Sequence, residues 1–168
     1  MQRILILGSG GAGKSTLANI LAPKLDLPII YLDQYYWKAG WQLVSPKEWE
    51  STIPKLAQEE QWIMDGNYAS TLDLRLKRAD TAIFLDLPRI HCIYRILKRY
   101  WQYRGKTRPG ISSNCPERLS WAFLKYLWSY PNTMKPKVLS LLKKHQPNTT
   151  IHILKNSKAI QAFLNKCT

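Results

Sequence analysis

The stretch GSGGAGKS, residues 8–15, decides the fold. It matches the pattern G-x-x-x-x-G-K-[ST], in which glycines turn successive backbone N–H groups toward phosphate oxygens. The apolar run Arg3–Leu7 stands directly before it, and a helix-like pattern runs from Lys14 to about Leu25. A strand, a glycine-rich turn and a helix in this order are the context that the motif requires. The sequence therefore predicts a phosphate-binding loop (P-loop) for a nucleoside triphosphate.

The residue types within this loop assign separate tasks. The helix that follows adds its positive N-terminal end to the backbone N–H groups. We expect Lys14 to reach the β- and γ-phosphates and the Ser15 hydroxyl to coordinate Mg²⁺. ATP and Mg²⁺ are thus the expected cofactors. The residues predicted to bind ATP are Gly8, Ser9, Gly10, Gly11, Ala12, Gly13, Lys14, Ser15 and Thr16.

Outside the loop, short apolar runs alternate with helical patterns. The predicted strands are Arg3–Leu7, Pro28–Leu32, Gln61–Met64, Thr81–Leu85 and Thr150–Leu154. These runs are mostly apolar rather than alternating, as expected of parallel strands covered on both faces. Strands that alternate with helices indicate an α/β fold with a parallel sheet.

Helical signals fill the intervals between these strands. Ser45-Pro46-Lys47-Glu48 matches a capping box with proline at the first helical position. Pro23 should kink the first helix or fix its end. Apolar residues recur at helical spacing from Ile90 to Trp101, and again from Trp121 to Trp128, where Trp121, Leu124 and Trp128 are predicted to be core residues.

Three aspartates follow predicted strands, where side chains at the carboxyl ends project toward a ligand. Asp65 follows an apolar run and is the predicted carboxylate near Mg²⁺, although Asp65-Gly66 is also a typical turn. Asp33 is predicted to position or deprotonate the phosphate acceptor, and its alternative role is an N-cap. For Asp86, two residues before Pro88, a structural role is favoured.

Several segments beyond the P-loop carry a family resemblance. The chain resembles the adenylate-kinase-like small-molecule kinases and, within them, is similar to the bacterial topology modulation proteins. The segments that carry this resemblance are Leu32–Trp41, Asp65–Tyr68, Leu85–Pro88, Arg75–Asp80, Tyr103–Pro109 and Cys115–Arg118. It implies a P-loop NTPase fold, with a five-stranded parallel sheet in the order 2-3-1-4-5, helices on both faces and a helical lid. It also implies ATP binding and kinase chemistry.

The resemblance also divides the chain into functional parts. Residues 1–168 are expected to form a single domain, with a lid at about 89–112 and an acceptor-binding segment at about 33–75. Arginines of the lid would meet charge on the transferring phosphoryl group, because guanidinium groups suit its equatorial oxygens. Arg75 is predicted to hold an anionic acceptor, with a structural ion pair as the alternative. The residues predicted to supply lid charge are Arg95, Arg99, Arg104 and Arg108.

The net charge of +14 leaves a second function open. Thirteen lysines and arginines and one acid, Glu117, lie between Arg89 and Lys144, interleaved with aromatic residues. Such a pattern suits nucleic acid, because aromatic rings stack on bases between cations. Besides a kinase of a nucleoside, nucleotide or other small metabolite, a DNA-binding protein that uses ATP thus remains an alternative. Tyr35, Tyr36, Trp37 and Trp41 would either stack on an acceptor base or pack a small substrate lobe.

The remaining composition narrows the class of protein. At 168 residues with 45% apolar side chains, the chain can bury a core. The run Ile4–Leu7 is too short for a signal peptide or a membrane span, so no membrane association is expected. Three cysteines at positions 92, 115 and 167 have no metal-binding spacing and indicate a reducing, cytoplasmic setting.

Overall fold

A computed structural model describes residues 1–167. Its central sheet consists of β1 (Arg3–Gly8), β2 (Ile29–Tyr31), β5 (Trp62–Asp65), β6 (Thr81–Leu85) and β7 (Thr150–Leu154). All pairings in this sheet are parallel and the strand order is β2-β5-β1-β6-β7. In order of appearance along the chain this is 2-3-1-4-5, which confirms the expected P-loop NTPase topology.

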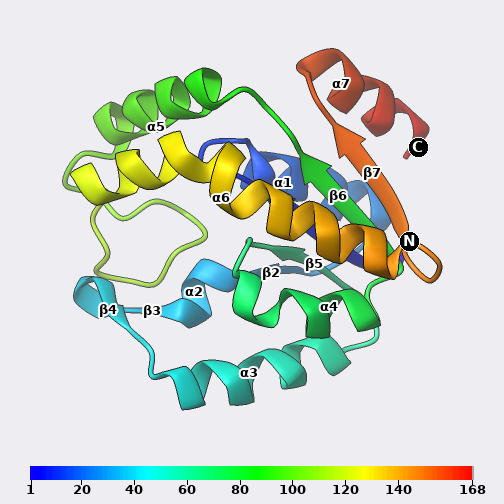
Figure 1. Ribbon diagram of the computed structural model, residues 1–168. Helices are drawn as coiled ribbons and strands as arrows, with labels where there is room; N and C mark the ends of the chain where they lie inside the picture. Colours follow the sequence, from blue (N-terminus) through cyan, green and yellow to red (C-terminus); the bar gives the residue numbers. More distant parts are fainter. Residues whose placement is uncertain (168) are drawn as a thin grey trace.

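Helices cover both faces of this sheet (Figure 1). Ile4 and Ile6 of β1 pack toward α1 (Lys14–Leu25) and α7 (Ser157–Lys166). Leu5 and Leu7 of the same strand pack in a second cluster with residues of α4 (Leu72–Arg78) and α6 (Trp121–His145). Because alternate side chains of a strand enter opposite faces, the short apolar runs of the sequence serve two cores at once.

The local start and stop signals work as the sequence predicts, with small differences. In α3 (Pro46–Gln58) the Ser45 hydroxyl accepts a hydrogen bond from the Glu48 backbone N–H at 3.1 Å. Helix α1 contains Pro23 and ends at Leu25. The second strand is shorter than predicted, because Leu32 already begins α2 (Leu32–Tyr36) and places Asp33 in its first turn.

A small hairpin follows α2 and faces the loop between α5 (Arg89–Tyr103) and α6. It consists of β3 (Trp37–Lys38), the 3₁₀ turn η1 (Ala39–Trp41) and β4 (Gln42–Leu43). A second 3₁₀ turn, η2 (Ala69–Thr71), precedes α4. Residues 104–120 contain no helix, and they carry Arg108 and Glu117 back toward Asp33.

The apolar residues of α5 point the other way from those of a core helix. Ile90, Tyr94 and Trp101 are exposed, Trp101 to 70%. The buried positions of this helix are Cys92 and Ile96, which pack beside the P-loop. Helix α5 therefore packs two small or medium side chains against the P-loop and exposes its larger apolar side chains to solvent.

The prediction that Trp121 and Trp128 belong to the core is wrong. Trp121 is 84% exposed and Trp128 is 53% exposed. The buried stripe of α6 consists instead of Leu127, Tyr130, Val138, Leu142 and His145, and Leu124 is half-buried beside it. Trp128 holds the guanidinium of Arg89 over its ring at 3.9 Å.

Within residues 1–167 we find no helix with the length and apolar character that crossing a membrane requires.

Candidate active site

The P-loop connects β1 to α1 and is packed from outside by the helices α5 and α6. Gly11 has a φ of 76°, and a Cβ at this position would lie 2.3 Å from the carbonyl oxygen of Cys92. A Cβ on Gly10 would lie 2.8 Å from the Phe123 ring. A side chain at Gly11 would therefore clash with backbone, and one at Gly10 would require the Phe123 ring to shift, independently of any ligand. The Lys14 ammonium lies over the loop and donates to the Ser9 carbonyl at 3.0 Å.

Asp65 and Ser15 meet where β5 runs beside β1. The register pairs Ile6 with Asp65, which brings the carboxyl end of β5 next to the start of the loop. The Ser15 hydroxyl donates to Asp65 Oδ2 at 2.5 Å, and the carboxylate is buried. Burial raises the pKa of Asp65, while Lys14 and the Ser15 hydrogen bond act in the opposite direction.

A hydroxyl and a carboxylate are hard oxygen donors that suit Mg²⁺. Residues 1–167 contain no group of three or more His, Cys, Asp or Glu side chains placed to hold a metal ion. A cation at Ser15 and Asp65 would therefore complete its shell with phosphate oxygens and water, which is how Mg²⁺ commonly binds beside nucleotides. These two residues fit a Mg²⁺ that arrives together with a nucleotide.

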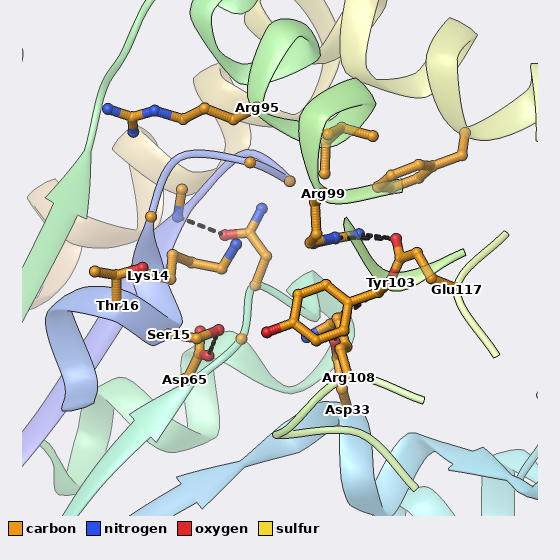
Figure 2. A pocket seen from close by; sticks show the side chains of 18 of the residues that line it. Lys14, Ser15, Thr16, Asp33, Asp65, Arg95, Arg99, Tyr103, Arg108 and Glu117 are labelled. Atoms are coloured by element: carbon orange, nitrogen blue, oxygen red, sulfur yellow. Dashed lines mark hydrogen bonds and ion pairs between the residues drawn. The ribbon is translucent and has the colours of Figure 1, made fainter. Parts of the chain in front are cut away.

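One cavity of about 860 Å³ joins the P-loop to the predicted acceptor side. Its walls include Gly8, Lys14, Ser15 and Thr16 of the loop and Asp65 of β5. Figure 2 shows Asp33, Arg108, Arg99 and Glu117 across the cavity from these residues. Residues as far along the chain as Glu117 thus share one space with the P-loop.

Asp33 is held from two directions. Tyr68 donates its phenolic O–H to Asp33 Oδ1 at 2.6 Å, and Arg108 donates to Oδ2 at 2.8 Å. Tyr68 has a backbone φ of 27° and lines the cavity. Burial and the neighbouring Asp33 charge raise the pKa of the Tyr68 hydroxyl, so it remains a donor. The first turn of α2 thus presents a carboxylate in a fixed orientation.

Glu117 joins two of the predicted lid arginines. Its Oε1 accepts hydrogen bonds from Arg99 Nε and Nη2 at 2.9 and 2.6 Å, and its Oε2 lies 3.3 Å from Arg108 Nε. The Glu117 side chain is only 3% exposed. The sequence contained a signal for this role, since Glu117 is the single acid between Arg89 and Lys144. The guanidinium groups of Arg99 and Arg108 are therefore both paired with carboxylates.

The other two predicted lid arginines lie differently. Arg95 lines the cavity, and it donates to the Ala12 carbonyl of the P-loop at 3.3 Å. Figure 2 shows its side chain extending away from Arg99, although both residues belong to α5. Arg104 follows the end of α5, its side chain is exposed and it does not line this cavity. The structure therefore groups Arg95 with the P-loop and leaves Arg104 outside.

The prediction that Arg75 holds the acceptor is wrong. Its side chain is fully buried, and its guanidinium donates to the carbonyls of Gly66, Asn67 and Tyr68 at 3.1, 2.8 and 2.8 Å. Burial lowers its pKa to about 9, and it is still a cation at neutral pH. Arg75 shapes the turn after β5 that carries Tyr68, because unpaired carbonyls buried there would be costly.

Two cavity residues received no role from the sequence, although both lie in segments that carry the family resemblance. Tyr103 ends α5, and Figure 2 shows its hydroxyl pointing into the cavity. Asn67 accepts from the Gly8 N–H at 3.4 Å and donates to the Tyr130 hydroxyl at 2.9 Å, linking the loop to α6. The aromatic residues after Asp33 divide, since Trp37 and Trp41 line the cavity while Tyr36 packs against Trp49.

The chain resembles known proteins in sequence and in fold. No family model matches the chain. The chain is 27% identical over 133 residues to the uncharacterized protein YqaC of Bacillus subtilis, a match that covers 78% of this chain and 74% of that protein. Among solved structures, shikimate kinase from Acinetobacter baumannii, in complex with shikimate, superposes with a TM-score of 0.58 at 17% identity. That match covers 99% of this chain and 90% of the enzyme.

A second shikimate kinase, from Bacteroides thetaiotaomicron, gives a TM-score of 0.52 at 18% identity, over 98% of this chain and 95% of that one. Both superpositions span nearly the whole of each chain, so the likeness extends beyond the P-loop. At this level of identity they speak for the architecture alone. The chain therefore has the fold of the shikimate-kinase-like P-loop kinases.

Proposed function

We propose that this protein is a kinase that transfers the γ-phosphoryl group of ATP to a hydroxyl of a small acceptor, with Mg²⁺ bound at Ser15 and Asp65. The observation that carries this proposal is the single cavity, which holds a P-loop, the Ser15–Asp65 pair and the separate Asp33 carboxylate. A protein that only hydrolysed or sensed ATP would not need a second oriented carboxylate on the far side of the triphosphate site. The kinase fold of the neighbours supports the same reading.

In this reaction Asp33 orients the acceptor hydroxyl and takes its proton. The acceptor oxygen forms a bond to the γ-phosphorus, the bond from that phosphorus to the β–γ bridging oxygen breaks, and ADP leaves. When bound, Mg²⁺ neutralises charge on the β- and γ-phosphates. Tyr68 and Arg108 fix the Asp33 carboxylate in place, and such positioning makes a large part of the rate enhancement in these reactions.

Two of the cavity cations lie on the P-loop and would bind ATP, and two lie on the acceptor side and would act in the transition state. Within residues 1–167 the hydrogen bonds of Lys14 and Arg95 go to backbone carbonyls of the P-loop, partners that these cations would exchange for phosphate oxygens. Arg99 and Arg108 are held by Glu117 and Asp33 on the acceptor side. From there they would meet the charge that develops on the equatorial oxygens.

The acceptor atom is a hydroxyl rather than a phosphate oxygen. A phosphate oxygen is already ionised at neutral pH and needs no base, and the negative charge of Asp33 would repel it. An alcohol, in contrast, must lose a proton as it attacks. The solved neighbour in complex with shikimate offers a precedent for a small acceptor in this fold.

The test is a screen with γ-labelled ATP and Mg²⁺ against nucleosides, sugars and cyclic polyols, each with and without added DNA. The proposal expects a labelled product with one class of hydroxyl compound, no product when EDTA removes the metal, and no stimulation by DNA. Release of inorganic phosphate that rises with DNA, with no labelled acceptor, would instead identify the DNA-binding alternative. That outcome would overturn the kinase.

A further inference from the structure

Arg118 lines the cavity, and within residues 1–167 its charge is not paired with a carboxylate. Of the four arginines that line the cavity, Arg99 and Arg108 are paired with carboxylates and Arg95 donates to the P-loop. Arg118 has no hydrogen-bond acceptor or carboxylate partner within residues 1–167. Within these residues its guanidinium lies over the Trp41 ring, whose centroid is 4.8 Å from the guanidinium carbon.

The position of Arg118 is fixed relative to the acceptor side. Trp41 donates its indole N–H to the carbonyl of Pro116 at 2.8 Å, two residues before Arg118. The Gly40 N–H donates to the Asn114 carbonyl at 2.9 Å, which ties the same two segments together a second time. Arg118 therefore follows a segment that is hydrogen-bonded to the hairpin after Asp33. Lys98 also lines the cavity and has no ion pair within residues 1–167, but it belongs to α5.

Backbone strain marks the same wall of the cavity. Trp41 has a φ of 63° and Tyr68 has a φ of 27°, in a region that side chains with a Cβ rarely adopt. Each such residue costs on the order of 1–2 kcal/mol. Strained residues persist where the surroundings hold them, and they gather at functional sites. Both of these aromatic residues line the cavity, and Tyr68 also donates a hydrogen bond to Asp33.

We propose that Arg118 and Trp41 form an acceptor subsite that binds an oxyanion, a carboxylate or phosphate group, on a hydroxyl-bearing acceptor. Guanidinium groups pair with both kinds of oxyanion through two parallel N–H donors. Stacking on Trp41 leaves the edge of the guanidinium, which carries these donors, free for the ligand. The acceptor is then an organic anion whose oxyanion contacts Arg118 and whose hydroxyl is directed to Asp33.

This subsite rests on the proposed kinase function for its role, but it replaces the anion contact that the buried Arg75 cannot make. It also limits the substrate class. Neutral nucleosides and polyols would satisfy Asp33 and leave Arg118 without a partner, so they would bind more weakly than anions of the same shape. A charge-assisted contact of this kind is worth about 10- to 100-fold in affinity.

The test measures binding directly, with calorimetry in the presence of Mg²⁺ and the non-hydrolysable analogue in which nitrogen bridges the β- and γ-phosphates. Two ligand pairs serve as probes, namely uridine with uridine 5′-monophosphate and quinate methyl ester with quinate. The phosphate arm and the carboxylate arm identify which oxyanion is preferred. The variant is Arg118→Gln, and Arg89→Gln is its matched control, since Arg89 also stacks on a tryptophan but does not line the cavity.

The proposal expects at least one anion to bind about 10- to 100-fold more tightly than its neutral partner, with the difference lost in Arg118→Gln and kept in Arg89→Gln. Equal binding of neutral and charged members, absence of binding by both anions, or a preference that survives in Arg118→Gln would overturn it. The kinase itself is judged separately by labelled product. Anion binding that depends on Arg118 without any phosphoryl transfer would retain the subsite and reject the proposed reaction.

Discussion

The two halves of the cavity are built in different ways. The P-loop half is one continuous stretch, residues 8–16, whose shape is set by glycine backbone packed against α5 and α6. The acceptor half brings together Asp33, Tyr68, Arg108 and Glu117 from three segments, through side-chain hydrogen bonds and ion pairs. Damage to the first half should therefore abolish function, whereas damage to the second should reduce it in steps.

The largest effect is expected for Lys14→Ala. It removes the cation that lies on the P-loop and would contact the β- and γ-phosphates. We expect phosphoryl transfer to fall by about 10³-fold or more, a typical size for loss of a key phosphate-binding charge. Labelled-product assays measure this loss. Thermal unfolding should change little, since Lys14 is not part of either core, and an active Lys14→Ala variant would contradict the assignment.

Asp33→Asn should affect the rate more than nucleotide binding. The amide can still accept the Tyr68 hydrogen bond, but it cannot take a proton from the acceptor. We expect kcat to fall by about 10²- to 10⁴-fold, the range for loss of a general base. The KM for ATP should stay within about threefold of the parent because Asp33 lies across the cavity from the P-loop. Equal loss in both parameters would argue against an acceptor-side role.

Gly11→Ala tests whether the P-loop half is held by steric fit. The added methyl group meets the Cys92 carbonyl at 2.3 Å and sits at a φ of 76°. We expect the free energy of unfolding to fall by about 2–4 kcal/mol, the sum of overpacking and backbone strain. Gly40→Ala is the matched control, with a φ of 72° and no atom within 4 Å, and should cost only about 1 kcal/mol. Similar losses in denaturant titrations of both variants would refute the close fit.

The smallest of these effects is expected for Glu117→Gln in the acceptor half. Arg99 and Arg108 keep their charge but lose the carboxylate that aligns them. We expect kcat to fall by about 10- to 100-fold, as for misplaced catalytic groups, with an intact KM for ATP. Glu48→Gln removes the exposed ion pair with Lys38 and provides the control. A rate equal to that of Glu48→Gln would show that Glu117 does not position the arginines.

The same division decides how much was predictable. The P-loop, the strand order and the Ser45 cap are written in contiguous residues or follow from the family resemblance, and they are confirmed. Glu117 and Tyr103 lie in segments that carry the resemblance, but the sequence assigns them no role, because their roles arise only when distant segments meet in the fold. Residue type alone also misplaced Arg75, since an arginine serves equally well to bind carbonyls of the protein and anions of a ligand.

The excess of lysines is a further case in which composition said less than contacts. Lys135 pairs with Asp86 at 2.7 Å and Lys144 pairs with Asp73 at 2.8 Å. Lys135 thus joins α6 to the segment after β6, and Lys144 joins α6 to α4. The number of charges can be read from the sequence, but only the fold shows which of them are already paired.

The contacts at Gly10 and Gly11 have a consequence for how substrates enter. Because Cys92 of α5 and Phe123 of α6 both pack closely against the P-loop, an outward movement of either helix at that end would leave a cavity beside the phosphate site. Opening of the cavity would therefore cost less within residues 104–120, which contain no helix and in which Gly105 has a φ of 73° and open space around it. In such a movement the ends of α5 and α6 at the P-loop would stay in place, and the connection between the two helices would move.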